Sequence, residues 1–319
     1  MEWKINTEEV EAFEAHYHRL FQKQEQLLNK SPQSISVFQH VKEKLFEEWT
    51  YNSNGIDGNT ISLKETRVIL QDGMTVKGKS LQEHFELVNH HEAIEYLEAL
   101  SNINYILTEK DILDVHGILM CKIEKEFAGR YRNGAVRIAG ARFIPPNALK
   151  VKELMEALIN HVFENPLQLN PIALSCIFHH RFLQIHPFFN GNGKTARLIM
   201  NLILMRSGFP PAILLKNDRK KYFDALDLAD NSHYKKLILL VAQATERSLN
   251  FYSRAFPSTA SDEEYRSISE IVTDSDMPYS QEYVSLLARR GKIDAYKIGR
   301  NWMTNKKAIK DYLNRKISD

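Results

Sequence analysis

The chain has 319 residues, of which 43% are hydrophobic and 26% charged, a composition typical of soluble globular proteins with two or three domains. Its apolar runs are too short to span a bilayer, and its charged N-terminus does not resemble a signal peptide. The two cysteines, Cys121 and Cys176, form no cluster with metal-ligand spacing. They exclude a disulfide scaffold and favour a cytoplasmic protein without a membrane partner.

Charge is distributed unevenly along the chain. Residues 289–319 hold ten Lys and Arg against three Asp, a net charge of +7, whereas the whole chain carries only +2. The remainder is therefore acidic, at −5. Such asymmetry indicates an anionic partner for the C-terminal part.

Helical periodicity dominates the first 250 residues. It repeats over 92–103, 108–123, 152–163, 170–185 and 194–208. Thr108 lies three residues before Asp111, which predicts a capping box at the start of the second of these helices. The fourth is apolar nearly all round and is expected to be a buried central helix. The fifth ends at Gly208, ahead of a Pro pair.

Two segments interrupt this pattern. Residues 131–146 ("YRNGAVRIAGARFIPP") combine turn dipeptides with β-branched residues, which predicts a small β-hairpin around Gly140. Residues 253–265 are polar and rich in small side chains, which predicts a linker. After the linker, the pattern indicates two helices, a short hairpin over 293–304 and a last helix.

The segment "HPFFNGNGKTAR" (186–197) carries the main chemical signal. Gly191 and Gly193 allow close backbone approach just before a long helix, and exposed N–H groups at a helix start attract anions. Lys194 and Arg197 lie three apart and project from one face. A polyphosphate therefore fits this turn, with His186 as a candidate general base.

This segment has two other interpretations. The letters "GNGKT" imitate the end of a phosphate-binding P-loop, but Phe188 stands where that motif needs glycine, and a helix rather than a strand precedes it. The P-loop is therefore rejected. A His-Pro before a Gly-rich turn can also simply cap two core helices.

The full string resembles the Fic family motif, H-[PF]-F-x-[DE]-G-N-G-R-x-x-R, and the resemblance extends over about residues 45–250. It implies a mostly helical domain that transfers the AMP part of ATP to a Ser, Thr or Tyr hydroxyl of a protein. His186 then takes the proton of the target hydroxyl, Phe188 anchors the loop, and Arg197 holds the γ-phosphate. The resemblance implies that the remaining phosphate contacts come from Gly191, Asn192, Gly193 and Lys194.

Two positions depart from the family motif. Asn190 stands in place of the Asp or Glu that binds Mg²⁺ in the family, and a neutral carbonyl oxygen is a weaker Mg²⁺ ligand than a carboxylate. Lys194 replaces an arginine, which keeps the charge but loses the bidentate fork. We therefore expect Mg²⁺ to be held mainly by ATP and water, or activity to be weakened.

Residues 53–59 ("SNGIDGN") resemble the family's inhibitory motif, [ST]-x-x-x-E-G-N, with Asp57 in place of the glutamate. In the family this acid pairs with the second arginine of the motif, here Arg197, and excludes the γ-phosphate. Such a charge-assisted contact is directional. The alternative is a plain Asn/Gly turn ahead of a helix capped by Ser62 and Glu65.

The resemblance also assigns two further contact regions. The 131–146 hairpin is similar to the family flap, which holds a target segment by strand addition, here through Val136, Arg137 and Ile138. The alternative is a stabilising surface ribbon. Asn217 and Tyr222 match the region that holds ribose and adenine in relatives, although an aromatic residue there is often simply part of the core.

Residues 266–316 resemble winged helix-turn-helix modules of the excisionase and MerR types. The resemblance implies DNA binding, with contacts from Arg289, Arg290, Lys297 and Arg300. About six neutralised phosphates would give micromolar, salt-sensitive binding. The alternative is a basic face that docks a protein.

We therefore predict a mostly α protein: a Fic-type helical bundle with a β-hairpin flap and a C-terminal winged helix-turn-helix domain. Its expected parts are an N-terminal helical region (1–100), a catalytic core (101–252), a linker (253–265) and the winged domain (266–319). The predicted function is autoinhibited protein adenylylation with ATP and Mg²⁺, and a homodimer is compatible with it. The alternatives are a nucleotide-sensing DNA-binding regulator and a Fic-type phosphotransferase.

Overall fold

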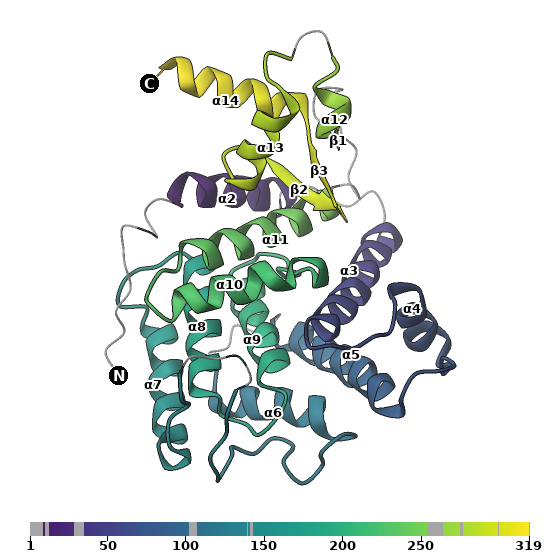
Figure 1. Ribbon diagram of the computed structural model, residues 1–319, viewed down its shortest axis with the longest axis vertical. Coiled ribbons are helices and arrows are strands. Elements are labelled where there is room, and N and C mark those ends of the chain that lie inside the picture. The colour runs from purple at the N-terminus through teal and green to yellow at the C-terminus, as the bar shows by residue number, and fades with distance from the viewer. Residues whose placement is uncertain are drawn as a thin grey trace.

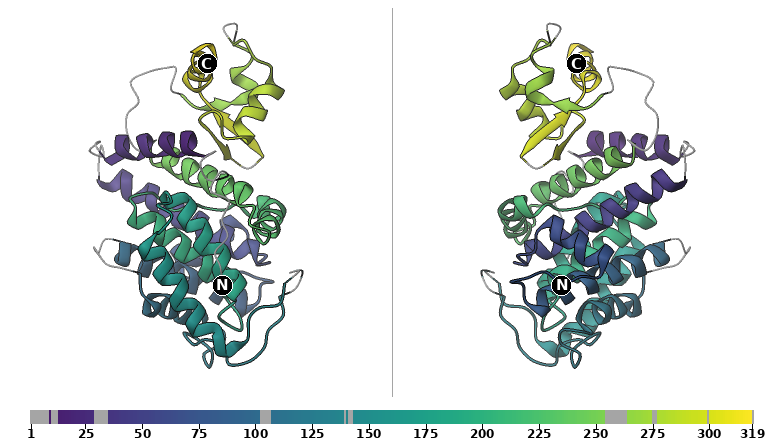
Figure 2. Two further views of the ribbon diagram at one scale, coloured as in Figure 1. Left: turned by 90° about the vertical axis from the view of Figure 1, so that its left-hand side faces the viewer. Right: turned by 90° about the vertical axis from the view of Figure 1, so that its right-hand side faces the viewer.

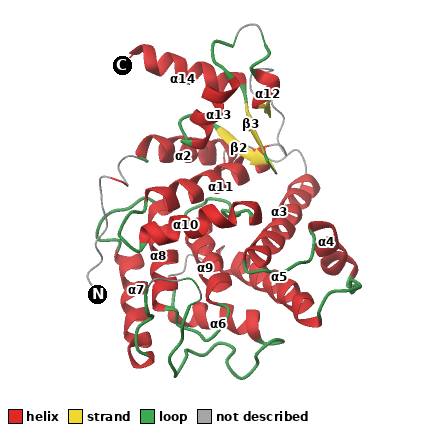
Figure 3. Ribbon diagram, in the orientation of Figure 1, coloured by secondary structure: helices red, strands yellow, loops and turns green. Residues whose placement is uncertain are grey.

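A computed structural model describes Glu9 and residues 13–28, 35–101, 107–138, 140, 143–253, 264–274, 277–298 and 300–318. Helices make up most of it, and the strands are confined to the C-terminal end (Figure 3). The larger helices are α2 (Glu14–Leu28), α3 (Ile35–Ile56), α4 (Leu63–Asp72), α5 (Leu81–Ser101), α6 (Glu109–Met120), α7 (Val151–Glu164), α8 (Pro171–Ile185), α9 (Asn192–Arg206), α10 (Arg219–Ala229) and α11 (Lys235–Ser253). None of the described helices is long and apolar enough to cross a bilayer.

Local capping signals set the helix starts, as the sequence predicted. Thr108 and Asp111 form a reciprocal capping box at α6, and Ser62 and Glu65 form one at α4. Each box satisfies backbone N–H groups that have no partner inside the helix. The local sequence therefore fixes where these helices begin, independently of their packing.

Helices α8 and α9 form the centre of the bundle and are buried on nearly all sides, as predicted. One face of the pair shares a core with α2, α10 and α11, and the other shares a core with α3, α5, α6 and α7 (Figure 1). Helices before residue 100 thus belong to the same hydrophobic cores as the later ones. We call residues 13–253 the helical domain, since the expected division at residue 100 is no break in packing.

The predicted hairpin at 131–146 is not formed: no strand occurs among its described residues, 131–138, 140 and 143–146. The buried Arg132 side chain holds the segment instead. Its guanidinium donates to the carbonyls of His186 (2.8 Å), Gly134 (2.8 Å) and Pro146 (2.5 Å). The Arg132 N–H donates to the Pro187 carbonyl (2.9 Å), so this backbone group pairs with the neighbouring loop rather than with an opposite strand.

Residues 264–318, which we call the C-terminal module, have their own small core of Ile, Leu, Val and Ala side chains. Their elements are β1 (Arg266–Ser267), α12 (Ile268–Ile271), α13 (Gln281–Arg289), β2 (Ala295–Ile298), β3 (Asn301–Thr304) and α14 (Lys306–Ser318). The sheet is antiparallel with β3 in the middle, pairing Ala295 and Arg266 with Thr304. The predicted order of two helices, a hairpin and a last helix is confirmed. The predicted linker lies largely outside the described residues.

A buried carboxylate, Glu246 of α11, joins the helical domain to the C-terminal module. Glu246 is fully buried and accepts from Arg19 (2.8 and 3.0 Å) and Lys23 (3.1 Å) of α2. Arg19 also donates to the Gly291 carbonyl (3.2 Å), and Lys23 forms an ion pair with Asp294. The module therefore rests on α2 and α11, which lie side by side beneath it (Figure 2).

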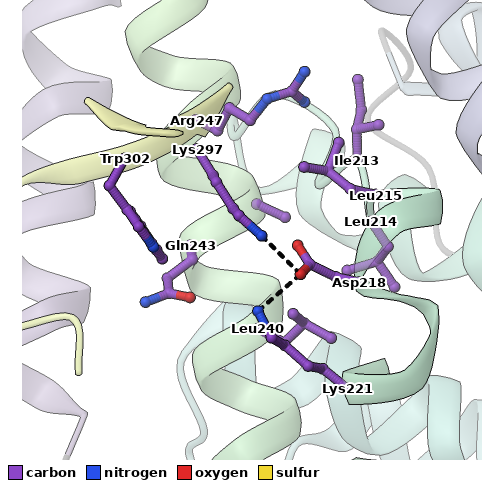
Figure 4. Close-up of a pocket in the computed structure, with 11 residues that line it drawn as sticks. Ile213, Leu214, Leu215, Asp218, Lys221, Leu240, Gln243, Arg247, Lys297 and Trp302 are labelled. Atoms are coloured by element: carbon purple, nitrogen blue, oxygen red, sulfur yellow. Dashed lines mark hydrogen bonds and ion pairs between the residues drawn. The ribbon is translucent and has the colours of Figure 1, made fainter. Parts of the chain in front are cut away.

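A second contact involves the short helix η2 (Lys216–Asp218). Asp218 accepts from Lys297 of β2 (3.0 Å) and from Lys221 of α10 (2.8 Å), as Figure 4 shows. Lys297 thus faces the helical domain and shares the Asp218 carboxylate with Lys221. This ion pair competes with its predicted contact to a DNA phosphate, which stays a prediction.

Candidate active site

The loop between α8 and α9 brings together the ends of two buried helices. His186 ends α8 in a left-handed conformation (φ 50°), with its N–H donating to the Phe182 carbonyl (2.9 Å). Gly191 precedes α9 with φ 74°, and a Cβ there would lie 3.0 Å from Met120 Sδ. Position 191 therefore requires glycine for both its backbone conformation and the space around it.

Two side chains hold the loop in shape from within. Phe188 is completely buried, as the sequence predicted for an anchor. The Asn192 side chain accepts from the Phe188 N–H (3.0 Å) and donates to the Phe188 carbonyl (2.8 Å). The Asn192 side-chain amide therefore stabilises the loop, while its backbone N–H belongs to the first turn of α9. The predicted phosphate contact of this residue stays a prediction.

His116 of α6 fixes the loop from the other side. Its ring stacks on Phe188 at 3.6 Å with an interplanar angle of 1°. Its Nδ1 accepts from the Gly129 N–H (3.0 Å), so its Nε2 carries the proton and donates to the Asn190 carbonyl (3.1 Å). Burial lowers the pKa of His116 to about 4. No spacing signal in the sequence links His116 to a loop 74 residues later.

His186 is half-buried, and its side chain is uncharged near neutral pH. Burial lowers its pKa to about 4, the Leu183 carbonyl opposes this shift and the nearby Arg132 cation adds to it. A neutral imidazole can accept a proton, which is what a general base requires. The structure thus gives His186 the protonation state that its predicted role needs.

Arg197, on the first turns of α9, is only 3% exposed and is held by the end of α3. Its guanidinium donates to Asp57 Oδ2 (2.8 Å), to Ser53 Oγ (3.0 Å) and to the Ser53 carbonyl (2.9 Å). Burial acts to lower the pKa of Arg197, but Asp57 and Tyr222 outweigh it and the pKa is raised. The predicted contact between Asp57 and Arg197 is therefore present in the structure.

Lys194 lies between two carboxylates. Its Nζ is 3.6 Å from Asp57 Oδ2 and 3.7 Å from Glu86 Oε2 of α5. Glu86 also accepts from the Asn59 side chain (3.0 Å), which ties it to the residues that follow Asp57. Both predicted cations are thus neutralised by acidic groups. No pattern in the sequence points to Glu86, because its contacts depend on where α5 lies.

The two residues predicted to hold ribose and adenine occupy different environments. Asn217 lies in η2 and is exposed. Tyr222 is 2% exposed, and its hydroxyl is 2.7 Å from His179 Nε2 and also interacts with the Arg197 guanidinium. Tyr222 is therefore a buried partner of Arg197, and its predicted contact with the base stays a prediction.

Asn190 lies at the rim of the site, and residues 136–138 belong to the segment that the sequence predicted to hold a target. Asn190 is exposed, and its amide nitrogen donates to Glu124 Oε1 (2.9 Å). Val136, Arg137 and Ile138 alternate between half-buried and exposed in an extended stretch.

Comparisons with known proteins agree with this geometry. The Fic/DOC family profile matches residues 106–204. The "Protein adenylyltransferase Fic" of Aedes aegypti is 36% identical over 74% of this chain and 47% of its own length, and that of Nematostella vectensis is 35% identical over 73% and 55%. The structure of a single-substitution variant of Fic-1 (residues 134–508) from C. elegans is 31% identical, with a TM-score of 0.68 over 76% of this chain and 72% of that chain.

The chain belongs to the Fic family. It spans about half the length of the curated relatives it matches. The Fic match covers α6 to α9 and therefore includes the loop, His186 and both cations of the site. The family assignment and the geometry thus point to the same residues.

The His116 contacts predict a specific dependence of stability on pH. The folded-state pKa of about 4 lies below the ordinary 6.5, so the unfolded chain binds more protons between these values and stability falls as pH drops through this window. We expect His116→Gln to reduce the loss of unfolding free energy between pH 7 and pH 5 by about 2 kcal/mol. Urea unfolding at the two pH values measures this difference.

The matched control is His18→Gln, a change at an exposed side chain, which should leave the difference between pH 7 and pH 5 unaltered. If His116→Gln leaves the difference in unfolding free energy between pH 7 and pH 5 unchanged, the assignment of a neutral ring held by two hydrogen bonds is contradicted.

Proposed function

We propose that this Fic protein is a protein adenylyltransferase that transfers AMP from ATP to a Ser, Thr or Tyr hydroxyl of a target protein or of itself. The observation that carries the proposal is the loop itself: a neutral imidazole at one end, and Lys194 and Arg197 on the first turns of the helix that follows. The printed names of the relatives support the same reaction.

The start of α9 has the properties of a triphosphate site. Its first N–H groups have no partner inside the helix, and the helix dipole favours negative charge there. A Cβ on Gly193 would lie 3.2 Å from Arg197 Nη1 and 3.3 Å from Asp57 Oδ1. The absence of a side chain at 193 therefore leaves room for phosphate oxygens between the backbone and the Arg197 guanidinium.

His186 supplies the proton transfer in the proposed reaction. The target hydroxyl oxygen attacks the α-phosphorus, the bond from that phosphorus to the bridging oxygen breaks, and pyrophosphate leaves. The hydroxyl proton passes to the His186 imidazole, which is neutral because its pKa is about 4. Lys194 and Arg197 stabilise the charge on the departing phosphates. Mg²⁺, when bound with ATP, neutralises further phosphate charge.

Residues 53–59, which we call the inhibitory segment, hold this site in an inactive form. Asp57 and Ser53 lie four residues apart at the end of α3 and occupy three hydrogen-bond donors of Arg197. A γ-phosphate would need the same donors, and Asp57 would repel it. The Asp57 side chain is 29% exposed, so its carboxylate can turn from Arg197 into solvent without opening the core.

Removal of the Asp57 carboxylate should activate the protein. We expect Asp57→Gly to label itself from α-labelled ATP with magnesium at least about tenfold faster than the parent, since one charge-assisted contact is worth roughly 1.5–3 kcal/mol. Asp57→Glu keeps an acid at this position and should label itself as slowly as the parent. Asp57→Gly combined with His186→Ala should give no label.

The same assay separates the alternatives. Label from γ-labelled ATP alone would support a Fic-type phosphotransferase. Equal labelling of the parent and the Asp57→Gly variant would contradict inhibition by this segment. No label from either nucleotide would favour the nucleotide-sensing regulator.

Tyr222 has a distinct role in this scheme, because it belongs to α10 and not to the α3 end that carries Ser53 and Asp57. When Ser53 and Asp57 release Arg197, Tyr222 remains to orient the guanidinium. We expect Tyr222→Phe, in the Asp57→Gly protein, to weaken ATP binding about three- to tenfold, as measured by calorimetry.

Tyr234→Phe is the matched control, because it removes an equivalent buried hydroxyl, 2.9 Å from His180 Nδ1. Both variants should lose a similar amount of stability, but only Tyr222→Phe should alter ATP affinity. Equal effects on affinity would show that Tyr222 contributes only to packing.

The C-terminal module is proposed to bind a polyanion such as DNA. Arg289, Arg290 and Arg300 are exposed and remain available to phosphates, whereas Lys297 is paired with Asp218. We expect Arg289→Ala with Arg290→Ala to reduce the slope of log binding constant against log salt by about 2. Lys220→Ala, which removes an exposed cation of the helical domain, should leave the slope unchanged. An intact module that does not bind DNA at low salt would favour protein docking instead.

A further inference from the structure

Asn190 and Glu124 form a pair at the rim of the candidate active site. The Asn190 amide nitrogen donates to Glu124 Oε1 (2.9 Å), and its amide oxygen accepts from the Gly191 N–H (2.8 Å). The amide orientation follows from these two bonds, since the reverse orientation would set a donor against a donor at Gly191. Position 190, where the family motif carries an acid, is therefore neutral but in contact with a carboxylate.

Helix α6 fixes both members of this pair. Glu124 lies in the turn after α6, and its N–H donates to the Met120 carbonyl (2.8 Å). His116 of the same helix holds the Asn190 carbonyl at 3.1 Å. The distance between the Glu124 carboxylate and the phosphate-binding loop is thus set by a rigid element rather than by the loop alone.

The carboxylate retains its capacity to bind a cation. An ionised carboxylate offers about four lone-pair sites, and Asn190 occupies one of those on Glu124. By contrast, the Asn190 oxygen already accepts a hydrogen bond and carries no charge. Between the two side chains, Glu124 is the stronger ligand for a hard cation.

These donors fit a magnesium ion that arrives with a nucleotide. Mg²⁺ is usually held by one or two carboxylates, by phosphate oxygens and by several waters. Within the described ranges no group of three or more His, Cys, Asp and Glu gathers into a preformed cage. One carboxylate beside the start of α9 is the protein contribution that such a nucleotide-bound ion needs.

We propose that Glu124 is the carboxylate that holds the divalent cation of bound ATP, taking over the role that the family motif gives to position 190. The proposal rests on the nucleotide binding proposed above. Asp at 190 beside Glu124 would place two carboxylates in contact, which costs free energy unless one is protonated. Asn190 removes that repulsion and leaves the pair with a single negative charge.

ATP affinity measured by calorimetry, with Mg²⁺ and with EDTA, tests this assignment in the Asp57→Gly protein. We expect Mg²⁺ to tighten ATP binding, and Glu124→Gln to remove roughly 10- to 100-fold of that gain. Affinity in EDTA should not fall in Glu124→Gln, since the variant only removes a negative charge beside the phosphates. Retained binding in EDTA also verifies that the variant is folded. The control Glu126→Gln, at an exposed acid two residues away, should keep the full Mg²⁺ effect.

An exchange of charge makes the test specific. Asn190→Asp combined with Glu124→Gln returns the acid to position 190 and should restore the Mg²⁺ effect. A Mg²⁺ effect that survives Glu124→Gln, or that is absent from the Asp57→Gly protein although ATP binds, would overturn the assignment of Glu124. If ATP binds in neither solution, the proposed function fails and this inference fails with it.

Discussion

The buried Arg197 guanidinium is the group on which the rest of the site depends. A cation that is 3% exposed must be paired, because an unpaired buried charge costs several kcal/mol. The structure meets this requirement with Asp57 and Ser53 on one side and with Tyr222 on the other. A phosphate can replace the first two partners without exposing the charge. In the proposed function, inhibition and nucleotide binding therefore compete for the same donors.

The loop that carries the chemistry is rigid because of contacts from outside it. Stacking by His116, a buried Phe188 and the amide of Asn192 fix its backbone, while Arg132 binds the carbonyls around His186. Catalysis by charge stabilisation needs donors that are already in position when the charge develops. These contacts provide that order for the proposed reaction.

Much of this arrangement could be predicted from the sequence, since it depends on local patterns. The helices and the capping boxes at Ser62 and Thr108 follow from periodicity and local spacing. The contact of Asp57 with Arg197 was instead predicted from the resemblance to the family motif. The partners of Glu86, Glu124 and Lys297 could not be predicted, because each pair joins elements whose approach is set by packing. Among the described residues of 131–146, the predicted hairpin is not formed for the same reason. Arg132 and the neighbouring loop provide hydrogen-bond partners for backbone groups of this segment.

The affinities of ATP and ADP for the parent and for Asp57→Gly test the central claim most directly, because the two nucleotides differ in the γ-phosphate. If Asp57 and that phosphate compete for Arg197, removal of Asp57 should tighten ATP binding by about tenfold or more and ADP binding by clearly less. Equal changes for the two nucleotides, or no change for either, would contradict the account.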